Sequence, residues 1–258
     1  MIFDSHAHYT DERFDSDRDE LLSSLPSSGV GAVFLPGSSF EDSLAAVRLA
    51  GRYGHVWAGA GIHPHGAAES PPDELEKIEE LLANAAAHRI VAVGECGLDY
   101  HYDFSPRDTQ KDCFDAQIAL SVKYGLPLII HDREAHADTL DLLRAHPGAR
   151  GVFHCYSGSA EMVNIVVKMG FYVSFSGSVT FKNAHRLRDA ARAVPAKRLL
   201  VETDAPYLSP EPARGRRNDS RMIRHILAVL AETRGVTTGE LEELTWVNAH
   251  EFFGIGPG

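Results

Sequence analysis

Short apolar runs alternate with longer amphipathic stretches along the whole chain. The apolar runs predict eight strands, near residues 2–4, 30–35, 56–60, 90–94, 127–130, 151–153, 171–175 and 199–203. Apolar residues at helical spacing predict helices near 15–25, 39–53, 72–88, 107–124, 134–145, 159–169, 182–193, 219–234 and 237–249. The pattern is therefore a regular alternation of strand and helix.

Buried strands separated by amphipathic helices are typical of a parallel sheet that is covered by helices. Eight such units in 258 residues suit a closed (β/α)8 barrel of the TIM type. An open doubly wound sheet is the alternative. The chain has no low-complexity linker and no tandem repeat, so we predict one domain over residues 1–258.

Residues that can bind metal follow several of the predicted strands. His6 and His8 follow the first strand, and alternate residues of an extended segment project to the same face. Later apolar runs end at Glu95, His131, His154 and Asp204. In a barrel, chemistry gathers at the C-terminal ends of the strands. Only closure brings the first and eighth strands around one centre, so these positions favour the barrel.

Four imidazoles and two carboxylates are too many for one tetrahedral ion with an open position. They suit two divalent ions that share a bridging carboxylate and activate a water molecule. We assign His6, His8 and Asp204 to one ion, and His131 and His154 to the other.

Glu95 lies midway in the strand order and is the predicted bridge between the two ions, whereas Asp204 is predicted to take the proton of the water. The identity of the ions is left open: histidine favours Zn²⁺ or Mn²⁺, whereas carboxylate and phosphate ligands favour Mg²⁺.

The net charge of −11 argues against a protein that coats DNA, because such proteins carry a basic surface. A polyanionic substrate would need local attraction from metal ions and arginines. Arg133 lies near the predicted ligands, and the loop after the last strand carries Arg214, Arg216 and Arg217. We predict that these arginines hold phosphate, with a salt bridge at the barrel rim or an exposed loop as the alternatives.

Several weaker signals complete the prediction. His63 either lines the substrate cleft or is a structural loop residue. Cys96 and Cys155 follow predicted ligands and are read as buried spectators. Tyr100, Tyr102 and Phe181 are candidates for stacking on bases, although packing in the core or at the rim is the preferred reading for Phe181. Asp99 is expected either to accept a hydrogen bond from a ligand histidine or to orient the loop.

The sequence shows neither a signal peptide nor an apolar run of the roughly 20 residues that cross a membrane. We therefore expect a cytoplasmic protein that makes no use of a membrane. Nothing in the sequence points to an obligate protein partner.

Seven motifs resemble those of the TatD-like metal-dependent hydrolases, a branch of the amidohydrolase-like barrels. They are Asp4–His8, Gly61–His65, Gly94–Tyr100, His131–Arg133, His154–Ser159, Glu202–Tyr207 and Arg214–Asn218. The resemblance covers essentially the whole chain, as far as Asn248 and Phe253-Gly254. Two departures, Glu134 where Asp is expected and Arg216 where Lys is usual, keep the charge.

The resemblance implies a barrel with a dinuclear site that hydrolyses phosphodiester bonds. Family members are typically described as Mg²⁺-supported deoxyribonucleases, some of them exonucleases on single strands. The metal positions of the family fall on the six residues chosen from the strand ends. Related dinuclear amidohydrolases commonly use a modified lysine as the bridge, and the Glu95 of this chain fits the TatD-like branch.

Two other functions stay open. Dinuclear barrels also cleave amides and esters, so the substrate could be an aminoacyl ester such as a mischarged tRNA. A binding protein without catalysis is the third reading, and the complete set of six ligands argues against it.

Overall fold

The structure is a computed structural model, and it describes residues 1–256. The contacts within the chain divide it into two compact units. The first unit comprises Met1–Leu35 and Cys155–Gly258, and the second comprises Pro36–His154. A single domain over the whole chain stays a prediction.

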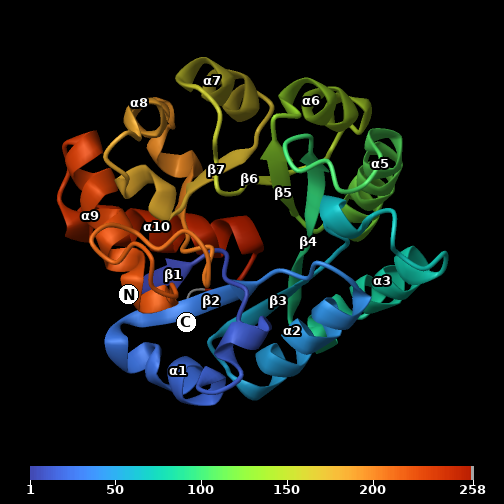
Figure 1. Cartoon of the computed structure of the whole chain (residues 1–258), viewed down its shortest axis with the longest axis horizontal. Coiled ribbons are helices and arrows are strands. Elements are labelled where there is room, and N and C mark those ends of the chain that lie inside the picture. The colour runs from blue at the N-terminus through green and yellow to red at the C-terminus, as the bar shows by residue number, and fades with distance from the viewer. Residues whose placement is uncertain (257–258) are drawn as a thin grey trace. The chain divides into compact units, whose positions relative to one another are not determined.

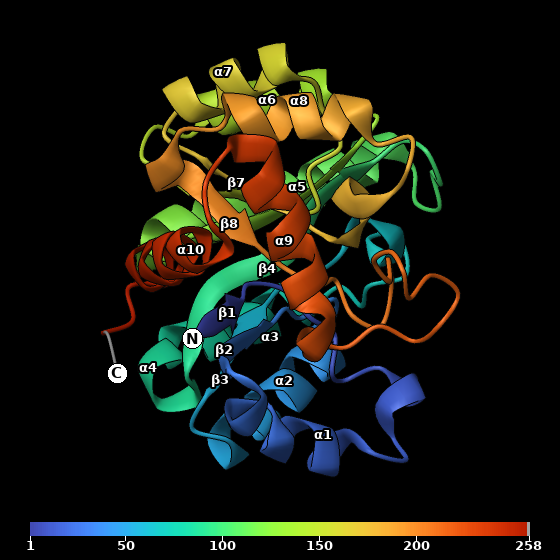
Figure 2. The same cartoon turned by 90° about the vertical axis from the view of Figure 1, so that its left-hand side faces the viewer.

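The first unit holds four strands, β1 (Ile2–Asp4), β2 (Val30–Leu35), β7 (Tyr172–Phe175) and β8 (Leu199–Val201). Its helices are α1 (Arg18–Ser24), α7 (Ala160–Lys168), α8 (His185–Ala193), α9 (Ile223–Arg234) and α10 (Thr238–Phe253). Strand β1 pairs with β2 and β7 pairs with β8, both in parallel. Helix α10 packs against β1 and β8 (Figure 2).

The chain just after β1 runs beside the chain just after β8. The amide of Ser5 donates to Val201 at 3.1 Å, and the amide of His8 donates to Ala205. Ala7 and Ala205 form a parallel bridge. The first and last strands of the chain therefore lie side by side within this unit.

The second unit holds the other four strands, β3 (Val56–Ala60), β4 (Ile90–Asp99), β5 (Leu128–Arg133) and β6 (Gly151–Phe153). Its helices are α2 (Phe40–Arg52), α3 (Glu74–Ala83), α4 (Ala85–His88), α5 (Arg107–Tyr124) and α6 (His136–Ala145). The strands pair in parallel in chain order. Helices α5 and α6 pack outside β4 and β5 (Figure 1).

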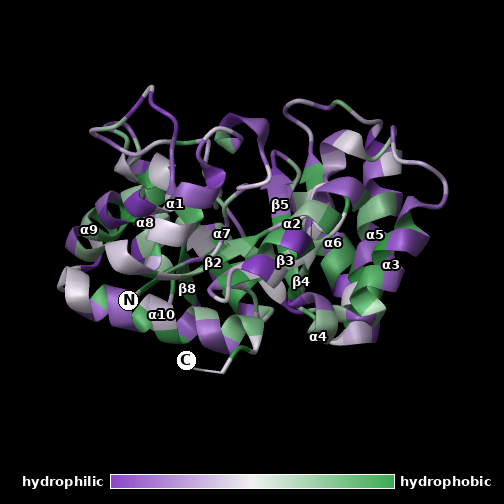
Figure 3. Ribbon diagram, turned by 90° about the horizontal axis from the view of Figure 1, so that it is seen from below, coloured by the Kyte–Doolittle hydropathy of each residue, from purple (hydrophilic) through white to green (hydrophobic). Residues whose placement is uncertain are grey.

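Burial, helix capping and amphipathic patterning explain where the strands and helices form. Every residue of β4 is buried, as expected for a strand covered on both faces. Ser39 caps α2 by accepting from the amide of Asp42, and Thr237 forms a capping box with Glu240 at the start of α10. The helices carry both hydrophilic and hydrophobic residues (Figure 3), which is the amphipathic pattern of a covering layer.

The strand order follows the chain from β1 to β8, and helices follow the strands throughout. This arrangement confirms the predicted (β/α)8 barrel. None of the helices in residues 1–256 has the length and apolar character to span a bilayer.

Candidate functional site

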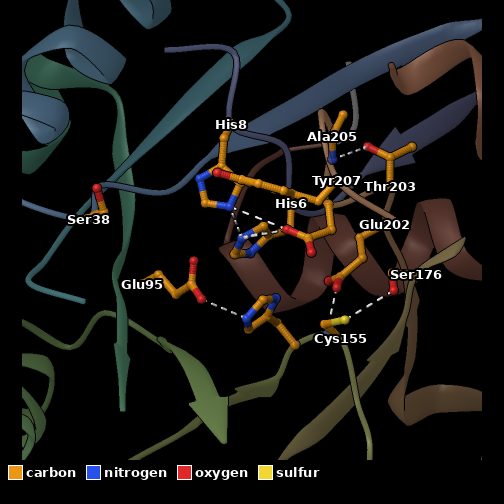
Figure 4. Close-up of polar contacts among 12 residues, drawn as sticks. His6, His8, Ser38, Glu95, Cys155, Ser176, Glu202, Thr203, Ala205 and Tyr207 are labelled. Carbon is orange, nitrogen blue, oxygen red and sulfur yellow. Dashed lines mark hydrogen bonds and ion pairs between the residues drawn. The ribbon is translucent and has the colours of Figure 1, made fainter. Parts of the chain in front are cut away.

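The first unit brings together His6, His8 and Asp204, which we call the first cluster. The Nε2 atoms of the two histidines lie 3.1 Å apart. Asp204 Oδ1 lies 3.3 Å from His8 Nε2 and 3.9 Å from His6 Nε2. The rings of His6 and His8 turn their edges toward each other (Figure 4). Three atoms that can bind a metal therefore converge on one point.

Backbone pairing places this cluster. The amide of Asp204 donates to the carbonyl of His6 at 2.9 Å, which joins the segment after β1 to the segment after β8. Asp204 itself has a φ of 57°, in the left-handed region. Asn218 holds the following turn, because its side-chain amide donates to the carbonyls of Thr203 and Tyr207.

Asp4 joins the two chain segments that carry the first cluster. This buried carboxylate accepts hydrogen bonds from the hydroxyls of Thr203 and Ser220, each at 2.6 Å, and from the amide of Thr203 at 2.9 Å. Burial raises the pKa of Asp4 to about 7, against the opposing effect of these donors. Sequence reasoning gave Asp4 no role, although a carboxylate inside an apolar strand is the signal that could have shown it.

Glu202 and Cys155 make a second polar contact in the first unit. The backbone amide of Cys155 donates to Glu202 Oε1 at 2.6 Å, and its Sγ lies 3.1 Å from Ser176 Oγ (Figure 4). Cys155 is half-buried, with a φ of 42°. The prediction of a buried spectator therefore fits Cys96, which is fully buried, better than Cys155.

The second unit brings three histidines onto one carboxylate oxygen, Glu95 Oε1. His131 Nδ1 and His154 Nε2 each lie 2.9 Å from this atom, and His63 Nε2 lies 3.2 Å away. We call Glu95, His63, His131 and His154 the second cluster. Sequence reasoning placed His63 either in a substrate cleft or in a structural loop and did not expect its contact with Glu95. The signal was available, since His63 also follows a buried strand.

Gly97 allows β4 and β5 to approach closely at this cluster. It has a φ of +140°, and a Cβ atom there would lie 2.0 Å from the carbonyl oxygen of His131. Gly97 and His131 are direct partners in the parallel pairing of the two strands. A side chain at residue 97 would therefore push His131 away.

The pKa values of Glu95 and His63 in the second cluster suit metal binding. Burial alone would raise the pKa of Glu95, but His154, His63 and His131 hold it well below its usual range. Burial lowers the pKa of His63 to about 4, which leaves its ring neutral near pH 7. An ionised carboxylate and a neutral imidazole are the forms that bind a metal ion.

Asp99 lies behind His131. Burial works to lower the pKa of His131, but hydrogen bonds with Asp99 and Glu95 raise it above its ordinary value. Asp99 Oδ2 lies 2.9 Å from His131 Nε2 and 2.8 Å from His65 Nε2. The expected hydrogen bond between Asp99 and a candidate ligand histidine is therefore present, in the arrangement that orients ligands in metal sites.

Both clusters fit divalent metal ions by the chemistry of their donors. Each combines imidazole nitrogens with a carboxylate oxygen, the ligand types of Zn²⁺ and Mn²⁺, and the carboxylates also suit Mg²⁺. His63, His65 and His131 form a further group whose ligand atoms all lie within 4.8 Å of one another.

The predicted arginines have different surroundings. The guanidinium of Arg133 lies 4.8 Å from the ring centre of Tyr102, and that of Arg214 lies 4.1 Å from the ring centre of Phe181. Arg216 is exposed. Arg217 makes a bidentate ion pair with Asp17. Its Nη1 lies 2.8 Å from Oδ1 of Asp17, and its Nη2 lies 2.5 Å from Oδ2.

Comparison with known proteins adds an independent line of evidence. A family model described as TatD related DNase matches residues 3–254. The uncharacterized metal-dependent hydrolase YabD of Bacillus subtilis (strain 168) is 38% identical over 258 residues, covering 99% of this chain and 100% of YabD. A Klebsiella pneumoniae (strain 342) protein named 3'-5' ssDNA/RNA exonuclease TatD is 38% identical over 264 residues, covering 98% of each chain.

The fold is also that of a solved relative. The crystal structure of YjjV, a TatD homolog from Escherichia coli K12, matches with a TM-score of 0.92 and 29% identity, covering 98% of each chain. The family match and these full-length alignments agree with the motifs at the strand ends. The chain belongs to the TatD-related DNase family.

Proposed function

We propose that this protein is a metal-dependent hydrolase that cleaves phosphodiester bonds of single-stranded DNA and removes nucleotides from an end. The observation that carries the proposal is the pair of histidine and carboxylate clusters at the ends of the parallel strands. The relatives named 3'-5' ssDNA/RNA exonuclease support the choice of a single-stranded substrate and extend it to RNA.

The first cluster would hold one divalent ion, and Glu95, His131 and His154 would hold a second, with His63 as a further donor. When bound, such ions supply a water that ionises near neutral pH and positive charge for the phosphate oxygens. The predicted role of Glu95 as a bridge between the ions belongs to this proposal.

Asp204 is the proposed proton acceptor. Its side chain is 13% exposed, so that it can meet a water molecule, and its carboxylate lies close to the Nε2 atoms of two histidines. Backbone hydrogen bonds from the turn after β8 hold it in place. A carboxylate placed in this way can take the proton of the water, whereas an amide cannot.

Arg133, Arg214 and Arg216 are the proposed contacts for phosphate groups that flank the cleaved bond. Arg133 is half-buried, and Arg214 and Arg216 are exposed. A planar guanidinium can hold a phosphate with two hydrogen bonds. The ion pair with Asp17 makes Arg217 the weakest of the four candidates, because its charge is already neutralised.

Asp204→Asn tests the proposal. The metal-stripped protein is assayed on single-stranded and duplex DNA labelled at the 5′ or 3′ end, with Mg²⁺, Mn²⁺ and Zn²⁺ added separately. We expect metal-dependent shortening of single strands and a loss of about 10²- to 10⁴-fold in the variant. The ladder of products gives the direction of digestion.

Asp189→Asn is the matched control, since Asp189 is an exposed carboxylate of α8 that pairs with the surface residue Arg192. Its activity should equal that of the wild type. Equal activity of Asp204→Asn would refute the role of Asp204. If no metal supports cleavage of any strand, the nuclease proposal fails, and an aminoacyl-tRNA becomes the next substrate to assay.

A further inference from the structure

Two large aromatic side chains lie exposed on the loop after β4. Phe104 is 67% exposed and Tyr102 is 48% exposed. Their rings stack on each other, with centroids 5.4 Å apart and an angle of 20° between the planes. We call Tyr102 and Phe104 the ring pair. Exposed apolar rings that gather in one place are typical of a binding site.

The loop is held by residues other than the ring pair. Asp99 Oδ1 accepts from the backbone amides of His101 and Tyr102 at 3.0 and 2.9 Å. The side chain of Gln110 donates to the carbonyls of Asp99 and Ser105. Because buried polar groups fasten both ends of the loop, the rings are presented on a fixed platform without being buried themselves.

The platform adjoins the second cluster. The His65 ring meets both rings edge to face, at 5.5 Å from Tyr102 and 4.9 Å from Phe104. The His65 ring also contacts the rings of His63 and His131, with centroid distances of 4.3 and 5.9 Å. One histidine therefore separates the ring pair from the candidate metal ligands.

Positive charge lies next to the rings. The guanidinium of Arg133 lies 4.8 Å from the centre of the Tyr102 ring. Arg133 pairs in the sheet with Asp99, the residue that fastens the loop. An occupant of this surface should therefore combine a flat apolar face with a nearby negative charge.

We propose that the ring pair stacks against an unpaired base of a single-stranded nucleic acid while Arg133 holds a phosphate of the same strand. The inference rests on the proposed nuclease function and names the part of the substrate that is recognised. Every base has a flat face, so stacking binds any single strand, whereas a base within a duplex is already stacked on its neighbours. The ring pair would thus select single strands over duplexes.

Tyr100 does not share this role. Its hydroxyl donates to Asp138 at 2.6 Å, and the guanidinium of Arg107 covers its ring at 4.2 Å. The sequence put Tyr100 and Tyr102 forward together, and the structure separates them: one is engaged within the fold, and the other is exposed.

The test compares binding of two labelled strands to the metal-free protein by fluorescence anisotropy. One is a hexamer of deoxythymidine, and the other has the same backbone without bases. We expect Phe104→Ala to weaken binding of the hexamer by about 5- to 150-fold, the range found when one base loses its stacking partner. Binding of the strand without bases should not change.

Three further variants sharpen the test. Phe104→Trp keeps an aromatic face and should bind the hexamer like the wild type, whereas Phe104→Leu keeps apolar bulk and should bind like Phe104→Ala. Val122→Ala is the matched control, because Val122 is also an exposed apolar residue, 42% exposed on α5. In the metal-loaded protein, Phe104→Ala should raise KM for the hexamer and leave kcat largely unchanged.

Four other outcomes would overturn the inference. The inference is overturned if Phe104→Ala binds the hexamer like the wild type, if it weakens both strands equally, or if the wild type binds neither strand. It is also overturned if Phe104→Ala changes the oligomeric state in sedimentation, since the rings would then be an interface between copies. A wild type that binds the hexamer through Phe104 and cleaves nothing would refute the nuclease function and leave the stacking site in place.

Discussion

At the scale of single residues, Asp4 shows how a buried carboxylate positions a site that it does not enter. It lies two residues before His6 and accepts hydrogen bonds from Thr203, which precedes Asp204. Its contact with Ser220 extends the same network to the turn before α9. One carboxylate therefore links the two segments that carry the first cluster.

Asp4→Ala should lower the free energy of unfolding by roughly 2–4 kcal/mol, because it leaves the Thr203 amide and two buried hydroxyls without an acceptor. Urea unfolding measures the change. Asp108→Ala is the control, since the Asp108 side chain is 92% exposed, and it should change stability by less than about 0.5 kcal/mol. If both variants unfold at the same urea concentration, Asp4 has no structural role of this kind.

At the scale of elements, β4 shows where the sequence pattern misleads. The prediction ended this strand at residue 94, whereas the structure extends it to Asp99. Gly94 and Gly97 interrupt the apolar run and look like a turn, but both occur in the strand with positive φ. Glycine is needed there because the neighbouring strand lies too close for a side chain.

Gly97→Ala should destabilise the protein by about 3 kcal/mol or more, since the added Cβ meets the His131 carbonyl and the φ value is strained for alanine. Thermal unfolding tests this expectation. Gly239→Ala is the matched control: Gly239 lies in the first turn of α10 with nothing within 4 Å of the added Cβ. A folded Gly97→Ala protein as stable as that control would contradict the account of the close approach.

Other helix boundaries in the structure differ from the predicted ones for local reasons. The helix expected over 72–88 is two helices, because the backbone leaves helical geometry at Asn84. The helix expected from residue 219 begins at Ile223, after a 3-10 turn that Asp219 caps. Such ends depend on cap geometry, which the apolar period does not report.

At the scale of the whole molecule, the two clusters predict that metal binding and folding are linked. Metal ions that bind only the folded chain add stability in proportion to the logarithm of their concentration, about 2.7 kcal/mol at 100 times the dissociation constant. We expect removal of metal with a chelator to lower Tm and readdition of Mn²⁺ or Zn²⁺ to restore it.

Glu95→Gln should reduce this gain, because the amide removes the negative charge on which three histidines converge. Elemental analysis should find about two ions per chain in the wild type and fewer in the variant. Two ions bound to Glu95→Gln with the affinity of the wild type would rule out Glu95 as a ligand.

The sequence alone determined the order of strands and helices, the barrel class and the residue types at the strand ends. These are local properties, since apolar period and the residue that follows a strand can be read along the chain. They predicted His6, His8, Glu95, His131, His154 and Asp204 as candidate ligands, and the proposal that these residues bind metal stands on that pattern.

Only the tertiary structure decided which side chains meet. It brought His63 onto Glu95, engaged Arg217 with Asp17, and left Phe104 exposed beside Tyr102. These contacts depend on strand register, on glycine positions that permit close approach, and on hydrogen bonds between segments up to 216 residues apart. No period along the chain encodes such distances, because packing and burial of the whole fold set them.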